Sequence, residues 1–90
     1  MPGKDFIPSS EDGFKLWSDN FMEKLSAIGA ETLMPPETYH ELVRLHDDYG
    51  KKYKLSEAPE TRTPVTVKSR IKAHEIFEEE LRLVIRSYIT

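Results

Sequence analysis

Two proline-containing breaks divide this 90-residue chain into three segments. Pro35-Pro36 cannot lie inside a helix, yet proline suits the first turn of a new helix because it has no N–H to lose there. Thr63-Pro64 repeats this arrangement, with Thr63 as the expected N-cap. Both breaks therefore predict a helix that starts directly after a short turn.

Apolar residues recur at helical spacing in each segment. Ser9 and Ser10 offer N-caps to the first helix, and Gly29 offers its C-terminal stop. Gly50 indicates a bend or a close helix contact in the second. The positions predicted to face inward are Phe14, Trp17, Phe21, Leu25 and Ile28 in the first helix, Tyr39, Leu42, Val43, Leu45, His46, Tyr49 and Tyr53 in the second, and Val67, Ile71, His74, Phe77, Leu81, Val84, Ile85 and Tyr88 in the third. The aromatic residues of the first helix are interpreted as core rather than as an exposed anchor for another protein.

Short turns between consecutive helices favour antiparallel neighbours. We therefore predict an all-α, up-down bundle of three helices near residues 10–28, 36–57 and 64–89, after an extended arm over residues 1–9, in a single domain of residues 1–90. The third helix has a strong start, but no glycine, asparagine or later proline ends it. An alternative interpretation is that the three helices belong to a truncated four-helix bundle.

The composition excludes several classes of protein. The chain has no cysteine, which rules out disulfides, thiol catalysis and cysteine-based zinc sites. The first residues, MPGKDFIPSSEDG, contain no apolar run of signal-peptide length, and no segment approaches the ~20 apolar residues of a membrane span. We therefore expect a soluble, cytoplasmic protein with no cofactor and no membrane partner.

Three stretches, FIPSSEDGFKLWSDNFMEKL, RTPVTVKSRI and ELRLVIRSYI, resemble in order and spacing a family of uncharacterised bacterial proteins. The features that carry the resemblance are the Phe6-Ile7-Pro8 arm, the stripe of Phe14, Trp17 and Phe21, the Arg62-Thr63-Pro64 turn, and Leu81-Arg82 before Tyr88-Ile89. In that family an N-terminal helical bundle commonly precedes a β-sandwich domain. The resemblance implies a longer protein that continues beyond Ile89 with a connector, a further helix and the sandwich. It implies no activity, because none is established for the family.

Glu37 and His40 form the one pair with the spacing of a metal-ligand motif. Glu-x-x-His places a carboxylate and an imidazole on one helical face, but di-iron carboxylate bundles need the motif twice, together with two further carboxylates. Here the motif occurs once, in a first helical turn where an acidic residue already complements the helix dipole. We therefore expect no metal, and Glu37 and His40 are the candidates if one is bound.

His46 and His74 lie on or beside the apolar stripes, and Glu78 is one helical turn beyond His74. The favoured interpretation is a core or boundary histidine with a hydrogen-bond partner, rather than a catalytic histidine–carboxylate pair. The sequence has no nucleophile elbow, glycine-rich phosphate loop or paired-carboxylate spacing. We predict that the protein has no catalytic residues and is not an enzyme.

Basic residues concentrate between Lys51 and Lys72. Seven basic and two acidic residues give this stretch a net charge of +5, whereas the whole chain carries −3. The second helix ends where the third begins, so these residues form a basic pole that could bind nucleic acid or another anionic partner through Lys51, Lys52, Lys68 and Arg70. The negative charge of the whole chain disfavours nucleic acid, and the lysines also complement the dipole of the second helix.

The predicted function is that of a non-catalytic structural or protein–protein interaction module within a larger bacterial protein. An uncapped third helix without a fourth helix leaves an apolar surface that a partner would cover. This surface is predicted at Leu81, Val84, Ile85 and Tyr88, and its expected occupant is a second copy of the chain or another protein domain. Binding of an anionic partner through the basic pole and metal-dependent catalysis are the two alternatives.

Overall fold

Three α-helices and two short helical turns form the described part of the chain, which is residues 7–8 and 10–89 of this computed structural model. In chain order they are α1 (Glu11–Ile28), the 3-10 turn η1 (Ala30–Thr32), α2 (Pro36–Glu57), α3 (Pro64–Val84) and the π-helical turn η2 (Ile85–Ile89). The prediction of an all-α, three-helix bundle is confirmed, and the described residues contain no strand. None of the described helices has both the length and the apolar character needed to cross a membrane.

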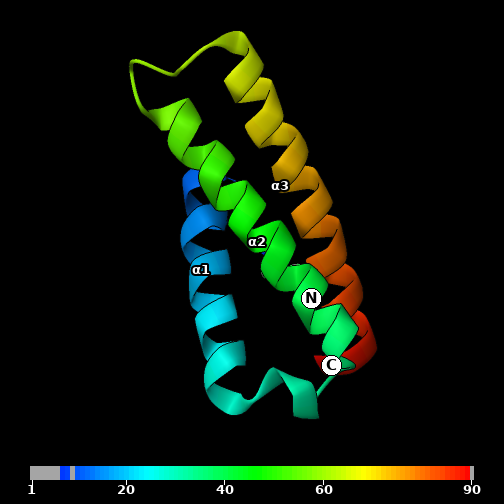
Figure 1. Cartoon of the computed structure of the whole chain (residues 1–90). Coiled ribbons are helices and arrows are strands. Elements are labelled where there is room, and N and C mark those ends of the chain that lie inside the picture. Colours follow the sequence, from blue (N-terminus) through cyan, green and yellow to red (C-terminus); the bar gives the residue numbers. More distant parts are fainter. Residues whose placement is uncertain (1–6, 9, 90) are drawn as a thin grey trace.

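α2 and α3 form an antiparallel hairpin, and α1 packs against it (Figure 1). The turn between α2 and α3 lies at one end of the molecule, and η1, which leads from α1 to α2, lies at the other (Figure 1). Of the two hairpin helices, only α2 has a backbone close to that of α1. α1 therefore reaches α3 through side chains alone.

Capping side chains fix the starts of α1 and α3. The Ser10 hydroxyl accepts a hydrogen bond from the Gly13 N–H at 3.1 Å. The Thr63 hydroxyl accepts one from the Thr66 N–H at 3.1 Å, while the Thr66 hydroxyl accepts one from the Thr63 N–H at 2.8 Å. This reciprocal pair is a capping box and confirms the predicted start of α3. Ser9, the other predicted N-cap, and most of the predicted extended arm lie outside the described residues.

The predicted C-terminal end is correct for α1 but not for α3. Gly29 adopts a φ of 80°, in the left-handed region, and ends α1 as predicted. α3 was expected to continue to residue 89, but its α-helical geometry ends at Val84, and Ile85–Ile89 form a π-helical turn. No residue there favours the left-handed conformation, so the backbone stays helical and widens instead of reversing.

The core lies where the three helices meet. Its largest fully buried side chains are Phe14, Leu42, Tyr49, Phe77, Leu81 and Val84. The ring of Phe14 is 5.4 Å from that of Tyr49 and 5.8 Å from that of Phe77, both in edge-on arrangements that suit aromatic pairs. Phe14 therefore joins α1 to both helices of the hairpin.

Some residues lie on a different side of their helix from the one predicted. Exposed rather than buried are Ile28, Ile71 and Tyr88. Ser18 and Met22, which the sequence pattern did not identify, occupy the buried line of α1 between Phe14 and Leu25. Ser18 fits there because its hydroxyl donates a hydrogen bond to a backbone carbonyl of α1 at 3.1 Å, so burial leaves it satisfied. A pattern that counts only apolar residues could not find it.

Candidate functional site

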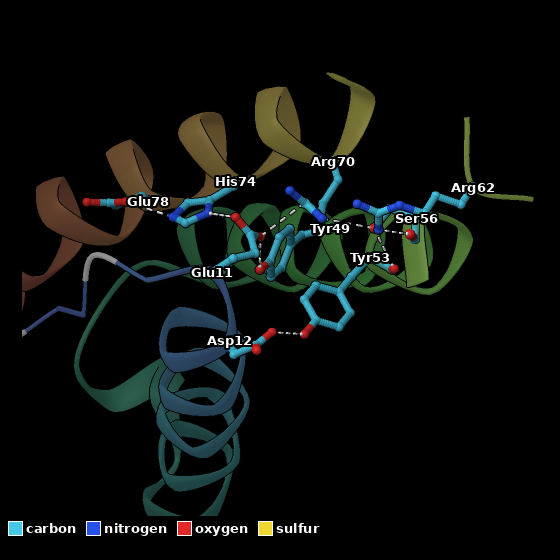
Figure 2. A network of polar contacts seen from close by, with 9 residues as sticks. All are labelled: Glu11, Asp12, Tyr49, Tyr53, Ser56, Arg62, Arg70, His74 and Glu78. Carbon is cyan, nitrogen blue, oxygen red and sulfur yellow. Dashed lines mark hydrogen bonds and ion pairs between the residues drawn. The ribbon is translucent and has the colours of Figure 1, made fainter. Parts of the chain in front are cut away.

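The inner face of the hairpin, which is the side of α2 and α3 that contacts α1, carries a cluster of polar side chains (Figure 2). At its centre is Glu11, in the first turn of α1. One Glu11 carboxylate oxygen accepts a hydrogen bond from the Tyr49 hydroxyl at 2.5 Å, and the other lies 2.9 Å from Nδ1 of His74. Nε of Arg70 lies 3.6 Å from the same carboxylate, which is an ion pair but too long for a hydrogen bond. Glu11 therefore ties α1 to both α2 and α3.

His74 is held between two carboxylates and an aromatic ring. Its Nε2 lies 2.9 Å from Oε1 of Glu78, while its Nδ1 faces Glu11. When both ring nitrogens carry a proton, His74 donates one hydrogen bond to Glu11 and another to Glu78. The imidazole stacks on Phe14 with 3.9 Å between ring centres, and Glu78 also accepts a hydrogen bond from Nε of Arg82 at 3.0 Å. The predicted histidine with a hydrogen-bond partner is confirmed, and Glu11 is a second partner that the sequence did not reveal.

Ser56 and two arginines extend the cluster toward the end of α2 (Figure 2). Ser56 is fully buried, and its hydroxyl donates a hydrogen bond to the Tyr53 carbonyl at 2.9 Å. Nη1 of Arg62 donates to the Ser56 carbonyl at 2.8 Å, and Nη1 of Arg70 donates to the Ser56 hydroxyl at 3.3 Å. Both guanidinium groups are therefore engaged inside the chain, and the Arg70 side chain is only 14% exposed.

Two tyrosines of α2 donate hydrogen bonds to the first turn of α1. The Tyr53 hydroxyl donates to Asp12 at 2.6 Å, and this bond, with partial burial and the nearby negative charge, raises the pKa of Tyr53 to about 12. Burial, reinforced by the hydrogen bond to Glu11, raises the pKa of Tyr49 well above its usual range. Both phenols therefore keep their protons, and their hydrogen bonds, at neutral pH.

A further contact between α1 and α2 is centred on Asp19. One carboxylate oxygen lies 2.7 Å from Nε2 of His46, and the other accepts a hydrogen bond from Nζ of Lys15 at 2.5 Å. Burial tends to raise the pKa of Asp19, but the hydrogen bonds of Lys15 and His46 outweigh it, and the pKa is lowered. His46 is therefore also a boundary histidine with a hydrogen-bond partner, as predicted.

The inner cluster is arranged to hold helices together. A general acid or base has to come within hydrogen-bond reach of a substrate. Here the carboxylates of Glu11 and Glu78 and the imidazole of His74 face one another, and each already has a partner within the chain. These hydrogen bonds fix the orientation of α1 on the hairpin.

The candidate metal ligands Glu37 and His40 both lie exposed in the first turns of α2. Over residues 7–8 and 10–89, no group of three or more His, Cys, Asp or Glu side chains is placed to hold a metal ion. The two side chains therefore have no third ligand beside them among these residues.

The predicted basic pole is divided between different sides of the hairpin. Lys52 and Lys68 line the same hollow between α2 and α3, but Lys51 lines another hollow, beside α1. Arg70 points into the inner cluster. The separation follows from helical geometry, because residues two positions apart, such as Lys68 and Arg70, project about 160° apart. Of the four predicted anion-binding residues, only Lys52 and Lys68 come together.

Three of the four residues of the apolar surface predicted near the end of α3 are buried. Leu81, Val84 and Ile85 are 0%, 1% and 5% exposed, and they belong to the core of the chain. The predicted location is wrong for these three residues because α2 packs along α3 and helps to cover this side. Tyr88 alone of the four is exposed. Self-association itself stays a prediction.

Three exposed apolar residues of α3, Val65, Ile76 and Leu83, lie instead on the outer face of the hairpin, which is the side turned away from α1. Two hollows lie on this face. The first is lined by Lys52, Val65, Lys68, Ser69 and Lys72. The second is lined by Glu41, Leu45, Ile76, Glu79, Glu80, Leu83 and Arg86. Lys72 and Ile76 are each two positions from His74, and Leu83 is nine, so all three project roughly 160–180° away from it. Val65, Ile76 and Leu83 are 72%, 44% and 50% exposed. This face combines exposed apolar side chains with charge.

Comparisons of the chain with protein-family models, with curated proteins and with solved structures found no match. The resemblance to a family of uncharacterised bacterial proteins therefore stays a prediction. Function is inferred from the contacts of the inner face and from the groups that the outer face exposes.

Proposed function

We propose that this chain is a non-catalytic protein–protein interaction module whose docking surface is the outer face of the α2–α3 hairpin. The observation that carries the proposal is the exposure of Val65, Ile76 and Leu83 on the side of α3 opposite His74. Apolar side chains on one side of a helix, beside a groove, are the usual contacts of a partner helix. Packing of a partner would remove this apolar surface from water.

The polar residues support the same proposal. The titratable groups of the inner cluster are used to join α1 to the hairpin, which leaves them engaged with one another. The three lysines that line one outer hollow are Lys52, Lys68 and Lys72, and no aromatic side chain of the described residues lines it with them. Stacking aromatics are the usual mark of a surface for single-stranded nucleic acid, and the chain as a whole carries −3. We therefore place these lysines at one end of a protein-docking face.

Site-specific photocrosslinking tests this function. A photoreactive amino acid is placed at Ile76 or at Leu83 in the full chain, and at the exposed residue Glu23 of α1 as a control. We expect protein adducts of defined mass from both outer-face positions and none from the control. The proposal fails if neither outer-face position gives an adduct, or if Glu23 gives the same adducts.

A further inference from the structure

We infer that the occupant of the outer face is a second copy of this chain, packed antiparallel about a two-fold axis that passes near Ile76. The inference rests on the proposed function, because it names the partner of the same face. The self-complementary charge of α3 carries it.

Charges of opposite sign lie on either side of Ile76. Lys72 is four residues before it, and Glu79 and Glu80 are three and four residues after it. At 1.5 Å per residue, the positive and negative groups are each about 5 to 6 Å along the helix from Ile76. Among the described residues, Lys68, Lys72, Glu79 and Glu80 take part in no ion pair. These charges are therefore available to a partner.

A two-fold axis turns this arrangement into matching contacts. In such an interface, residue i of one copy meets residue j of the other, and j meets i. With Ile76 on the axis and the two α3 helices antiparallel, Lys72 of each copy lies opposite Glu79 and Glu80 of the other. A parallel pairing in the same register would instead place Lys72 beside Lys72, which is repulsive. Charge complementarity therefore selects the antiparallel pairing.

The hollows on either side of Ile76 extend the same complementarity. Among the described residues, the hollow with Lys52, Lys68 and Lys72 is lined by three positive groups and by no negative one. The other contains three glutamates and Arg86, which gives it a net negative charge. Glu41 already pairs with Arg44 and Lys52 with Asp48, so the charges of Lys68, Lys72, Glu79 and Glu80 dominate the two hollows. Under the two-fold axis, the positive hollow of one copy meets the negative hollow of the other, and Leu83 approaches Ser69.

Charge reversal tests both the partner and the pairing. The wild-type chain is expected to be a dimer by light scattering on a sizing column, over roughly a hundredfold range of concentration. Lys72→Glu places glutamate opposite glutamate, and the double change Glu79→Lys, Glu80→Lys places lysine opposite lysine. Each variant alone is expected to weaken the dimer about tenfold or more, because both symmetric contacts become repulsive. An equimolar mixture of the two variants is expected to restore the dimer, because every contact across the axis is then attractive.

Controls separate association from folding. Lys24→Glu makes the same charge change at an exposed position of α1 and is expected to leave the dimer unchanged. Thermal unfolding of each variant followed by circular dichroism shows whether it still folds, which is expected because Lys72, Glu79 and Glu80 form no ion pair with another described residue.

The outcomes distinguish the inference from the proposed function. A wild-type chain that stays monomeric over the whole concentration range overturns the inference. So does a dimer that neither charge reversal weakens, or one that the mixture fails to restore. Photocrosslinks from Ile76 to a protein of a different mass would overturn the second-copy inference and leave the proposed function standing, whereas the absence of any crosslink would remove both.

Discussion

The inner and outer faces of the same hairpin use similar residues in opposite ways. On the inner face, Glu11 lies within hydrogen-bond distance of both Tyr49 and His74, although the three residues come from three different helices. On the outer face, Lys72 and Glu79 lie on the same helix seven positions apart and have no partner within the described chain. A polar group that is removed from water needs a partner, whereas an exposed one can stay solvated until another molecule arrives. The inner face is therefore a completed interface, and the outer face is an open one.

The inner face also explains how a helix with little backbone contact is held. The backbone of α1 approaches that of α2 but not that of α3. Its first turn compensates with Glu11 and Phe14, which both contact His74 of α3. On the outer face, none of the described residues outside α2 and α3 supplies such an anchor, and Val65, Ile76 and Leu83 are exposed.

The largest expected difference between the two faces is the effect on stability of removing a buried aromatic ring. Phe14→Ala removes a fully buried side chain that contacts Tyr49, His74 and Phe77, and should lower the free energy of unfolding by about 3–5 kcal/mol. Val65→Ala on the outer face should change it by no more than about 0.5 kcal/mol. Urea unfolding followed by circular dichroism measures both. Similar losses for the two variants would mean that the faces do not differ in packing as described.

A smaller effect is expected from the central carboxylate. Glu11→Gln keeps the shape of the side chain but removes the charge that faces His74, Arg70 and Tyr49, and should lower the free energy of unfolding by about 2 kcal/mol. Glu75→Gln, at an exposed position of α3, is the matched control and should stay within about 0.5 kcal/mol of wild type. Thermal and urea unfolding compare the variants. A Glu11→Gln protein as stable as the control would show that the cluster contributes little to holding α1.

The sequence predicted what depends on local spacing. The capping threonine of α3, the glycine stop of α1 and the three helices follow from a few neighbouring residues each, and the structure confirms them. Glu78 could be placed beside His74 because the two are one helical turn apart. Glu11 could not be, since it is 63 positions away from His74 and only the packing of α1 brings the two together.

The predicted interaction surface failed for a related reason. Leu81, Val84 and Ile85 form an apolar stripe, and a stripe alone does not reveal whether another helix of the same chain already covers it. The outer face was harder to recognise because its apolar residues are separated by charged ones, with Lys72 before Ile76 and glutamates after it. The position of α1 shows which side of the hairpin the described residues leave uncovered.

The inner face also has one place that is not filled, at Gly50 in α2. A Cβ added at Gly50 would meet no atom of another described helix within 4 Å, so the close helix contact, one of the two predictions for Gly50, is absent among the described residues. Gly50→Ala should therefore stabilise the protein by about 1 kcal/mol through helix propensity alone. Gly29→Ala should destabilise it by about 1 kcal/mol, because the φ of 80° is unfavourable for alanine. Chemical unfolding of the two variants should give changes of opposite sign, and a loss at Gly50 would mean that the site is more crowded than the structure indicates.

The smallest expected effect concerns the edge of the inner face, where Tyr53 donates a hydrogen bond to Asp12. The folded protein raises the pKa of Tyr53 from 10.0 to about 12, so its contribution to stability is fully present below pH 10 and is lost as the pH rises toward about 12. We expect this contribution to be at most about 1 kcal/mol, because the pair is partly exposed to solvent. Tyr53→Phe lacks both the hydrogen bond and the titration, so its free energy of unfolding should start below that of wild type and approach it over the same pH range. The raised pKa of Tyr49 is common to both proteins, and the difference between the two urea-unfolding profiles therefore isolates Tyr53. If the free energies of unfolding of the two proteins run parallel up to pH 12, the edge of the inner face at Tyr53 is as open to water as the outer face.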